Sequence, residues 1–309
     1  MLIKEIGENR FIDWISKVVP VCKDVICGIG DDCAVLNMSR KGFEILYATD
    51  NLIENVHYLV QDQPKAIGRK SLARVLSDIA AMGGIPKYAL LSMAIPMEMN
   101  IAYLESVVKG FLGLAKKYHV QLVGGDIARS PLGLNINVSI LGEIEKGAGV
   151  FRSGARAGDK IYVTGRLGGS ILGKHMSFVP RINESRWLHK RKIPNAMMDI
   201  SDGLAVDLRR MMIASHTGAV IYERSIPVSR DAHAMEDKHK AIDHALYDGE
   251  DYELLFTTRK KQSLWFNSFK ALFLTHITCV GEVTAGKRIF IESVSGEQYE
   301  INNMGYRHF

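Results

Sequence analysis

The chain has 309 residues, of which 47% are hydrophobic and 24% are charged, with a formal net charge of +5. These values are typical of an ordinary globular protein and exclude a disordered or fibrous chain. The length favours two domains over one, because a single hydrophobic core stops growing at about 250 residues.

The first half of the chain alternates between helical and strand periodicity. Apolar residues between Phe11 and Val19 recur at helical spacing and predict an opening amphipathic helix. A long helix is predicted from Pro64 to Met82, since proline favours a helix start and Gly83-Gly84 favours its end. The other predicted elements are strands at 25–28, 33–36, 43–48, 88–95, 120–123 and 134–144, and a helix at 100–118.

The stretch Gly147 to Gly158 is rich in glycine and small residues and predicts a boundary between domains 1–148 and 149–309. A second set of elements follows. We expect strands at 160–164, 196–200, 219–222, 252–258, 277–283 and 288–293, and helices at 202–214, just before 248 and from 262. Helices and strands mix without a strict rhythm, so the fold class is α+β.

Cysteine spacing and hydropathy narrow the class of protein further. The four cysteines have no CxxC spacing, which makes a zinc site improbable. The chain begins with no signal-like apolar core, and its longest apolar stretch, around Tyr88 to Pro96, is too short to span a bilayer. Basic triplets occur without interleaved aromatic residues. We therefore expect a reduced, cytoplasmic protein that binds neither nucleic acid nor membrane.

Aspartate recurs where apolar strands run into turns, often beside glycine. Such turns occur at 28–32, 48–50, 124–126, 199–203 and 248–251, and Asp78 lies late in the long helix. Carboxylate oxygens are the ligands that Mg²⁺ prefers, and Mg²⁺ commonly binds phosphate oxygens as well. Glycine beside the aspartate lets backbone amides approach a phosphate. The pattern therefore indicates metal-assisted phosphoryl transfer.

A structural interpretation stays open for each turn taken singly, because Asp and Gly are common turn makers and helix caps. Asp202, for example, could cap the helix that follows it. Two observations oppose this interpretation for the whole set. Asp31-Asp32 and Asp199-x-x-Asp202 cluster like charges, and Asp78 lies inside a helix rather than at its first turn.

The segment Gly168 to His175 almost matches the phosphate-binding loop pattern GxxxxGK[ST] and follows a predicted strand. His175 replaces the Ser or Thr whose hydroxyl would hold Mg²⁺ in such a loop. No nearby apolar strand ends in a convincing second metal-binding Asp. A true P-loop is therefore the weaker hypothesis.

In chain order, the motifs resemble those of the thiamine-monophosphate kinase family. The matching segments are GIGDDCAV (28–35), ATD (48–50) with His57, LSDIAAMG (76–83), GGD (124–126), RSGA (152–155), MDISDGL (198–204), GEDYELLF (249–256) and the C-terminal GYRHF (305–309). They run in order over nearly the whole chain. The ordered series is more specific than any single motif.

The resemblance implies a two-domain fold like that of aminoimidazole ribonucleotide synthetase, with a dimerising N-terminal domain, and transfer of the γ-phosphoryl of ATP to thiamine monophosphate. Implied catalytic residues are Asp78, Asp126 and Asp199. Ligands of several Mg²⁺ ions would be Asp32, Ala48 (through its carbonyl), Thr49, Asp50, Asp78, Asp126, Asp199 and Asp202. Contacts to ATP would come from Gly125, Asp126, Arg152 and Ser201, and contacts to thiamine monophosphate from His57, Glu250 and Tyr306.

Three positions depart from the family pattern: Ala48 replaces Ser or Thr, Ile127 replaces Thr and Asp248 replaces Gly. Two alternatives remain. One is another ATP-using enzyme of the same superfamily, such as a selenophosphate synthetase or hydrogenase maturation factor, whose reactive terminal cysteine this chain lacks. The other is a nucleotide or thiamine-phosphate binder without turnover.

Overall fold

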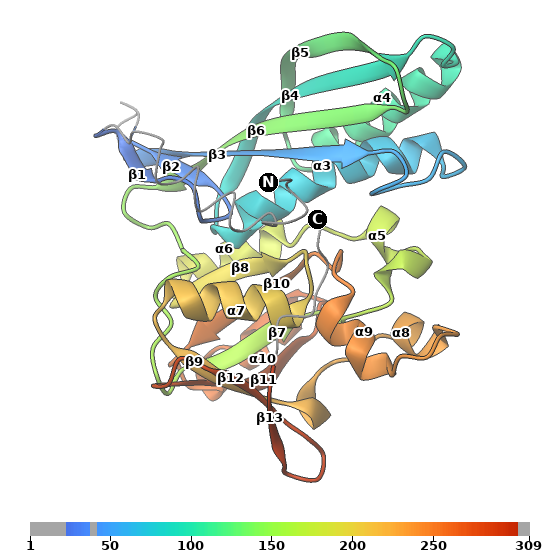
Figure 1. Ribbon diagram of the computed structural model, residues 1–309. Coiled ribbons are helices and arrows are strands. Elements are labelled where there is room, and N and C mark those ends of the chain that lie inside the picture. Colours follow the sequence, from blue (N-terminus) through green and yellow to red (C-terminus); the bar gives the residue numbers. More distant parts are fainter. Residues whose placement is uncertain (1–22, 38–41, 302–309) are drawn as a thin grey trace, which may run out of the picture.

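The computed structural model describes residues 23–37 and 42–301, which form two β-sheets with their covering helices (Figure 1). The first half holds a six-stranded sheet in the order β1-β2-β3-β6-β4-β5. Its elements are β1 (Val25–Cys27), β2 (Ala34–Leu36), β3 (Phe43–Ile53), α3 (Pro64–Ala81), β4 (Ile85–Pro96), α4 (Ile101–Lys117), β5 (Gln121–Ser130) and β6 (Asn135–Glu145). The predicted helix at 11–19 lies outside the described residues.

The second half holds a seven-stranded sheet in the order β13-β12-β9-β11-β7-β10-β8. Its strands are β7 (Lys160–Thr164), β8 (Ala196–Ile200), β9 (Gly218–Tyr222), β10 (Glu253–Thr258), β11 (Ile277–Thr284), β12 (Ile289–Glu292) and β13 (Gln298–Glu300). Its helices are α5 (Lys174–Ser177), α6 (Ile182–Lys190), α7 (Leu204–Ala214), α8 (Arg230–Ala234), α9 (Ala241–Tyr247) and α10 (Phe266–Leu272), with short 3₁₀ turns at Ser170–Leu172, Glu223–Ser225 and Gln262–Leu264. The mixture confirms the α+β fold class.

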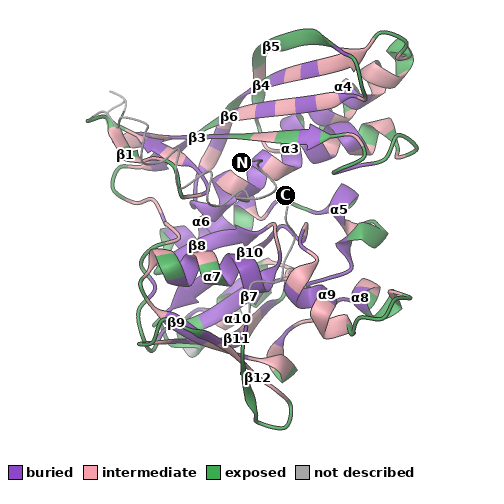
Figure 2. Ribbon diagram, viewed as in Figure 1, coloured by how far each residue is buried: buried purple, intermediate pink, exposed green. Residues whose placement is uncertain are grey.

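The two sheets differ in how they are covered. Side chains of β3 alternate between the side packed on α3 and α4 and an outer side that is largely exposed, whereas every residue of β8 and β10 is buried (Figure 2). In β10, Leu254 and Phe256 join one apolar cluster while Leu255 joins another on the opposite side. A sheet covered on both faces needs apolar residues in succession, which explains this difference in sequence pattern.

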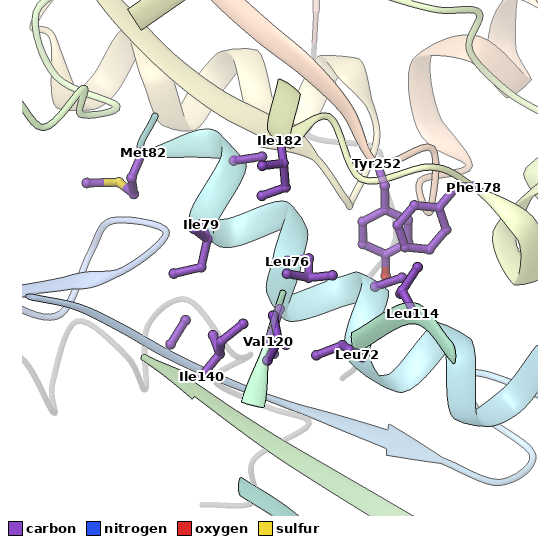
Figure 3. Packing of buried hydrophobic residues seen from close by; sticks show 14 of the residues in the cluster. Leu72, Leu76, Ile79, Met82, Leu114, Val120, Ile140, Phe178, Ile182 and Tyr252 are labelled. Carbon is purple, nitrogen blue, oxygen red and sulfur yellow. The ribbon is translucent and has the colours of Figure 1, made fainter. Parts of the chain in front are cut away.

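Helix α3 is the common element of both halves and lies between the first sheet and the second half (Figure 1). Leu72 and Leu76 of α3 belong to the same buried cluster as Phe178, Ile182 and Tyr252 of the second half (Figure 3). The Phe178 and Tyr252 rings stack with their centroids 4.0 Å apart. One continuous core therefore joins the two halves, and it holds polar residues of α3 next to the second sheet.

Two predicted aspartate turns prove to be strand interiors. Strand β3 continues through 48–50 to Ile53 because β6 pairs with it along its full length, and β5 continues through 124–126 because β4 offers a parallel partner. At Gly125, a Cβ atom would lie 1.8 Å from the Leu91 carbonyl oxygen, so this glycine reflects close strand approach rather than a turn. Local sequence favoured turns at both places, and long-range pairing overrode it.

None of the helices within 23–37 and 42–301 combines the length and apolar character needed to cross a membrane.

Helix α7 begins at Leu204, and its N-cap is Gly203, with no side chain capping it. The hypothesis that Asp202 caps this helix is therefore wrong. The domain boundary near residue 148 stays a prediction.

Candidate functional site

A cavity of about 530 Å³ lies between the two halves and gathers most of the predicted site residues. From the first half come Asp32, Thr49, Asp50, His57 and Asp78, and from the second half come Arg152, Asp199, Ser201, Asp202 and Glu250. The cavity wall also includes residues that the sequence did not single out as ligands: Asp31, Val56, Arg74, Ser170, Ile171, Met235, Asp237, His239, His244, Asp248 and Tyr252.

Three carboxylates meet in the cavity wall. Asp32, in the turn before β2, Asp78, in the last turns of α3, and Asp199, within β8, each offer an oxygen within 4.8 Å of the others. Burial raises the pKa of both Asp78 and Asp199 well above the usual range, and the negative charges of the neighbouring aspartates raise it further. Such a donor set fits a hard divalent cation, because carboxylate oxygens are its preferred ligands and its charge would relieve the repulsion.

Arg152 balances part of this negative charge. Its guanidinium donates to both oxygens of Asp32, at 3.1 Å from Nε and 2.9 Å from Nη2. The Asp31 carboxylate accepts the backbone N–H groups of Asp32 at 2.9 Å and of Arg152 at 3.1 Å. Burial, followed by the charge of Asp32, raises the pKa of Asp31 to about 7. Asp31 therefore orders the turn that presents Asp32.

Arg74 and Arg210 pair with two further predicted metal ligands. Arg74 Nε lies 2.9 Å from Asp50 Oδ2. Burial raises the pKa of Asp50 despite this cation. Arg210 pairs with Asp202 and also with Asp207, whose carboxylate accepts the backbone N–H groups of Ser201 at 3.0 Å and Asp202 at 2.9 Å. Asp207 thus fixes the turn that carries the predicted ATP and metal contacts.

The opposite part of the cavity is lined by Glu250 and His57. His57 Nδ1 accepts the Ile53 N–H at 3.1 Å, and the His57 carbonyl accepts a hydrogen bond from Lys70 Nζ at 2.6 Å. Lys70 Nζ also donates to Glu250 Oε2 at 2.8 Å. The Glu250 carboxylate lines the cavity, and Lys70, which balances its charge, does not line the cavity.

The departure at Asp248 has a structural account. Its carboxylate accepts the Gly169 N–H at 3.1 Å and contacts His244 Nδ1 at 3.0 Å, and His244 Nε2 lies 3.2 Å from Asp237. Burial alone would lower the pKa of His244, but the two carboxylates outweigh burial and raise it. The extra carboxylate is therefore compensated within the cavity wall.

The P-loop-like segment holds protein carboxylates. Both oxygens of Asp251 accept the Gly168 N–H, at 2.9 and 3.1 Å, and Lys174 Nζ contacts Asp251 Oδ1 at 3.3 Å. Helix α5 after Gly173 has only 4 residues. The amides and the ammonium that a P-loop directs at phosphate are engaged elsewhere, so the P-loop hypothesis does not fit the structure.

Three predicted residues that the structure describes do not line this cavity. Ala48 is buried in the interior of β3, and Gly125 and Asp126 are exposed on β5. Asp126 pairs with Ser92, which pairs with Asn137 and through it with Asn51, so Asp126 shares a sheet face with Asn51. Tyr306 lies outside the described residues. The roles of these four residues stay predictions.

Sequence reasoning missed Lys70 and Arg74. Both lie on α3 at spacings of four residues before Asp78, so the three side chains share one face of a mostly buried helix. Charged residues at this spacing in a helix buried on several sides were the signal that could have identified them.

The fold and the carboxylate-lined cavity define a protein of the AIR synthase related class. The model of the AIR synthase related protein N-terminal domain matches residues 30–144, and that of the C-terminal domain matches residues 170–293. Structures of the hydrogenase maturation protein HypE share the fold at 16–19% identity with TM-scores of 0.71–0.73.

Relatives with higher identity define the family within this class. Thiamine-monophosphate kinase from Buchnera aphidicola (subsp. Acyrthosiphon pisum) is 36% identical, covering 93% of this chain and 94% of that protein. The crystal structure of thiamine monophosphate kinase from Aquifex aeolicus has a TM-score of 0.78 at 32% identity, covering 97% of this chain and 100% of the other. The structure of AaThiL complexed with AMPPCP and TMP has a TM-score of 0.86 at 32% identity, covering 100% and 99%. The chain belongs to the thiamine-monophosphate kinase family.

Proposed function

We propose that this protein transfers the γ-phosphoryl group of ATP to the phosphate of thiamine monophosphate, giving thiamine diphosphate and ADP. The observation that carries the proposal is the meeting of Asp32, Asp78 and Asp199 in a cavity between the halves. Membership of the kinase family supports it, as does the match to a structure complexed with AMPPCP and TMP.

We assign the metal site to these three aspartates, completed by Thr49, Asp50 and Asp202 from the cavity wall and by Ala48 and Asp126 from the sheet. Bound Mg²⁺ would neutralise charge on the phosphate oxygens during transfer. Because the acceptor is an ionised phosphate, the chain needs no general base. Its own contribution is to align the two substrates and to balance their charge.

Arg152 and Ser201, with Gly125 and Asp126, are the proposed contacts to ATP. Arg152 lies at the aspartate side of the cavity, where its guanidinium can balance a polyphosphate as well as Asp32. His57 and Glu250, with Tyr306, are the proposed contacts to thiamine monophosphate. The two substrates would thus occupy opposite parts of one cavity, with the phosphates between them.

We further propose that the protein is cytoplasmic and forms a homodimer. We also propose that each chain is divided into domains 1–148 and 149–309. The outer face of the first sheet supports the dimer: Tyr47, Leu141 and Tyr88 pair across three adjacent strands, and they are 41%, 37% and 51% exposed. Apolar side chains in adjacent positions on one face are typical of an interface. The described cysteines are free thiols, as cytoplasmic proteins usually have.

The test is an assay of the purified protein with ATP, MgCl₂ and thiamine monophosphate, with thiamine diphosphate separated and measured after oxidation to its fluorescent thiochrome. We expect product only when all three components are present. A folded protein that binds ATP and thiamine monophosphate but forms no thiamine diphosphate would be a binder without turnover, which contradicts the proposal. Sedimentation of the same sample tests the dimer.

A further inference from the structure

Lys70 is a buried cation that touches the cavity wall from behind. Its side chain is 0% exposed, and Nζ contacts the His57 carbonyl at 2.6 Å, His175 Nδ1 at 2.9 Å and Glu250 Oε2 at 2.8 Å. Lys70 comes from α3 in the first half, His175 from α5 and Glu250 from the loop before β10. The cluster therefore joins three elements that are distant in sequence.

Burial of a lysine is unfavourable unless its charge is paired. Burial lowers the pKa of Lys70. Burial on its own would raise the pKa of Glu250, but the contact with His175, the hydrogen bond and charge of Lys70 and the charge of Arg74 outweigh it and lower the pKa to about 2. The Glu250 carboxyl is thus ionised at neutral pH, and Lys70 contacts it through Oε2.

The backbone of Glu250 is held in an unusual conformation. Its φ is 54°, and that of Tyr252 is 50°, both in the left-handed region that side chains rarely adopt. The Glu250 N–H donates to the Ser201 carbonyl at 2.7 Å, and the Ser170 hydroxyl donates to the Gly249 carbonyl at 2.9 Å. The segment 168–175 therefore holds the loop that carries Glu250 through a hydrogen bond to its backbone.

The two carboxylate oxygens of Glu250 have different surroundings. Oε2 accepts a hydrogen bond from Lys70 Nζ at 2.8 Å, and His175 Nδ1, which accepts a hydrogen bond from the same ammonium, lies 3.2 Å from Oε2. The other oxygen, Oε1, has a long contact of 3.4 Å from the Tyr252 hydroxyl. Since Glu250 lines the cavity and Lys70 does not, a ligand meets the carboxylate and not the ammonium.

We infer that Lys70 and His175 are positioning residues for Glu250, fixing Oε2 so that Oε1 faces the organic part of thiamine monophosphate. This inference rests on the proposed function. The thiazolium cation and the aminopyrimidine N–H₂ of that substrate are the kinds of group that a fixed, ionised carboxylate binds. The segment that resembles a P-loop thereby serves the acceptor substrate rather than ATP.

The experiment compares wild type with Lys70→Met, Glu250→Gln and the double variant, measuring kcat and KM for each substrate. For Lys70→Met we expect the KM for thiamine monophosphate to rise about 10- to 100-fold, as when one member of a buried charge pair is removed, while the KM for ATP changes less than about 2-fold. The double variant should match Glu250→Gln alone, because Lys70 acts through Glu250. His175→Gln should raise the same KM by a smaller factor.

Arg186→Met is the matched control. Arg186, on α6, pairs with Glu145 Oε1 at 2.7 Å and donates to the Gly83 carbonyl, so it also joins the halves, but it does not line the cavity. We expect it to lower thermal stability with an unchanged KM for thiamine monophosphate. An equal rise in KM for this control would show that any loosening of the two halves has the effect, and would overturn the inference.

Two further outcomes would overturn it: an unchanged KM for thiamine monophosphate in Lys70→Met, or a double variant whose defect is the product of the single defects. Should Lys70→Met fail to fold, His175→Gln decides in its place, and an unchanged KM for thiamine monophosphate in that variant would overturn the inference. Failure of the proposed function can be told apart from failure of this inference, because in that case the wild-type protein itself forms no thiamine diphosphate.

Discussion

The two parts of the cavity treat buried carboxylates in opposite ways. Burial raises the pKa of Asp78 and Asp199 well above the usual range, whereas the pKa of Glu250, whose side chain is 25% exposed, is lowered to about 2. The difference is the supply of cations, since Lys70 pairs with Glu250 directly while the clustered aspartates outnumber Arg152. The aspartates that the protein leaves unbalanced are the proposed cation site, and the carboxylate whose charge it balances is the proposed contact to the organic substrate.

One helix contributes to both parts. Three charged side chains follow one another along the same face of α3. Lys70 contacts Glu250, Arg74 contacts Asp50, and Asp78 lies beside Asp32 and Asp199. Because the rest of α3 packs in the core that joins the halves, the helix fixes the distance between the clustered aspartates and Glu250.

The largest expected effect comes from Asp78→Asn, which removes one of the three clustered carboxylates. We expect kcat to fall by about 10²- to 10³-fold, the range seen when one preorganised electrostatic group is removed from an active site. The metal-free protein should be as stable as wild type or more so, since a buried like charge is lost. Steady-state assays and thermal unfolding in EDTA measure the two effects.

Asp159→Asn is the matched control for that variant. Asp159 is 0% exposed and bonded to Asn195 at 2.9 Å, but it lies outside the cavity wall. We expect lower stability and an unchanged kcat. If Asp78→Asn lost stability and kept its activity, the contrast between the two parts of the cavity would be wrong.

Lys174→Ala tests whether the P-loop-like segment belongs to the ATP side. Lys174 contacts Asp251 at 3.3 Å and Glu253 at 3.1 Å, and these carboxylates are 0% and 1% exposed. Loss of a cation from such a pair costs about 3 kcal/mol of unfolding free energy, measured in urea. The KM for ATP should change little. Loss of both ATP binding and turnover in Lys174→Ala would restore the P-loop hypothesis.

Magnesium and pH should act together on stability. Burial raises the pKa of Asp31 and of Asp207 from the ordinary 3.8 to about 7, so the folded state takes up protons as pH falls through 7. The metal-free protein should therefore gain stability from pH 8 to pH 6, while the Glu250 pair, with a pKa of about 2, contributes equally at both.

Mg²⁺ added at about 100 times its Kd at pH 8 should raise stability by about 2.7 kcal/mol, and the same concentration should raise it less at pH 6, because protons compete for the same carboxylates. Differential scanning calorimetry with MgCl₂ or EDTA measures this. A response to Mg²⁺ that survives in Asp78→Asn would place the metal elsewhere.

The smallest effect is expected for Asp248→Ala. This change removes the carboxylate that contacts His244 and the Gly169 N–H. It leaves the contacts of Lys70 and of the Asp32, Asp78 and Asp199 cluster in place. We expect a loss of less than about 1 kcal/mol of stability, a surface-like value, and a change of at most about 3-fold in the KM for thiamine monophosphate. Titration by NMR should show a lower pKa for His244. A large rise in KM would make Asp248 a direct substrate contact.

Much of the fold could be predicted from the sequence because its signals are local. Pro64 and Gly83 frame α3, and apolar alternation located most strands. The interiors of β3 and β5 were mistaken for turns, since Gly124-Gly125-Asp126 has turn composition and only the partner strand β4 reveals its conformation. Strand length depends on the partner, which lies elsewhere in the chain.

The sequence by itself determined which acidic residues exist, their order and the family whose motifs they match. Only the tertiary structure decided which of them meet: the Ser77 hydroxyl reaches Asp199 across 122 positions, Arg152 reaches Asp32 across 120 and Lys70 reaches Glu250 across 180. Such pairs form because the common core packs α3 between two sheets, and the resulting excess or balance of buried charge is a property of that packing that local sequence does not encode.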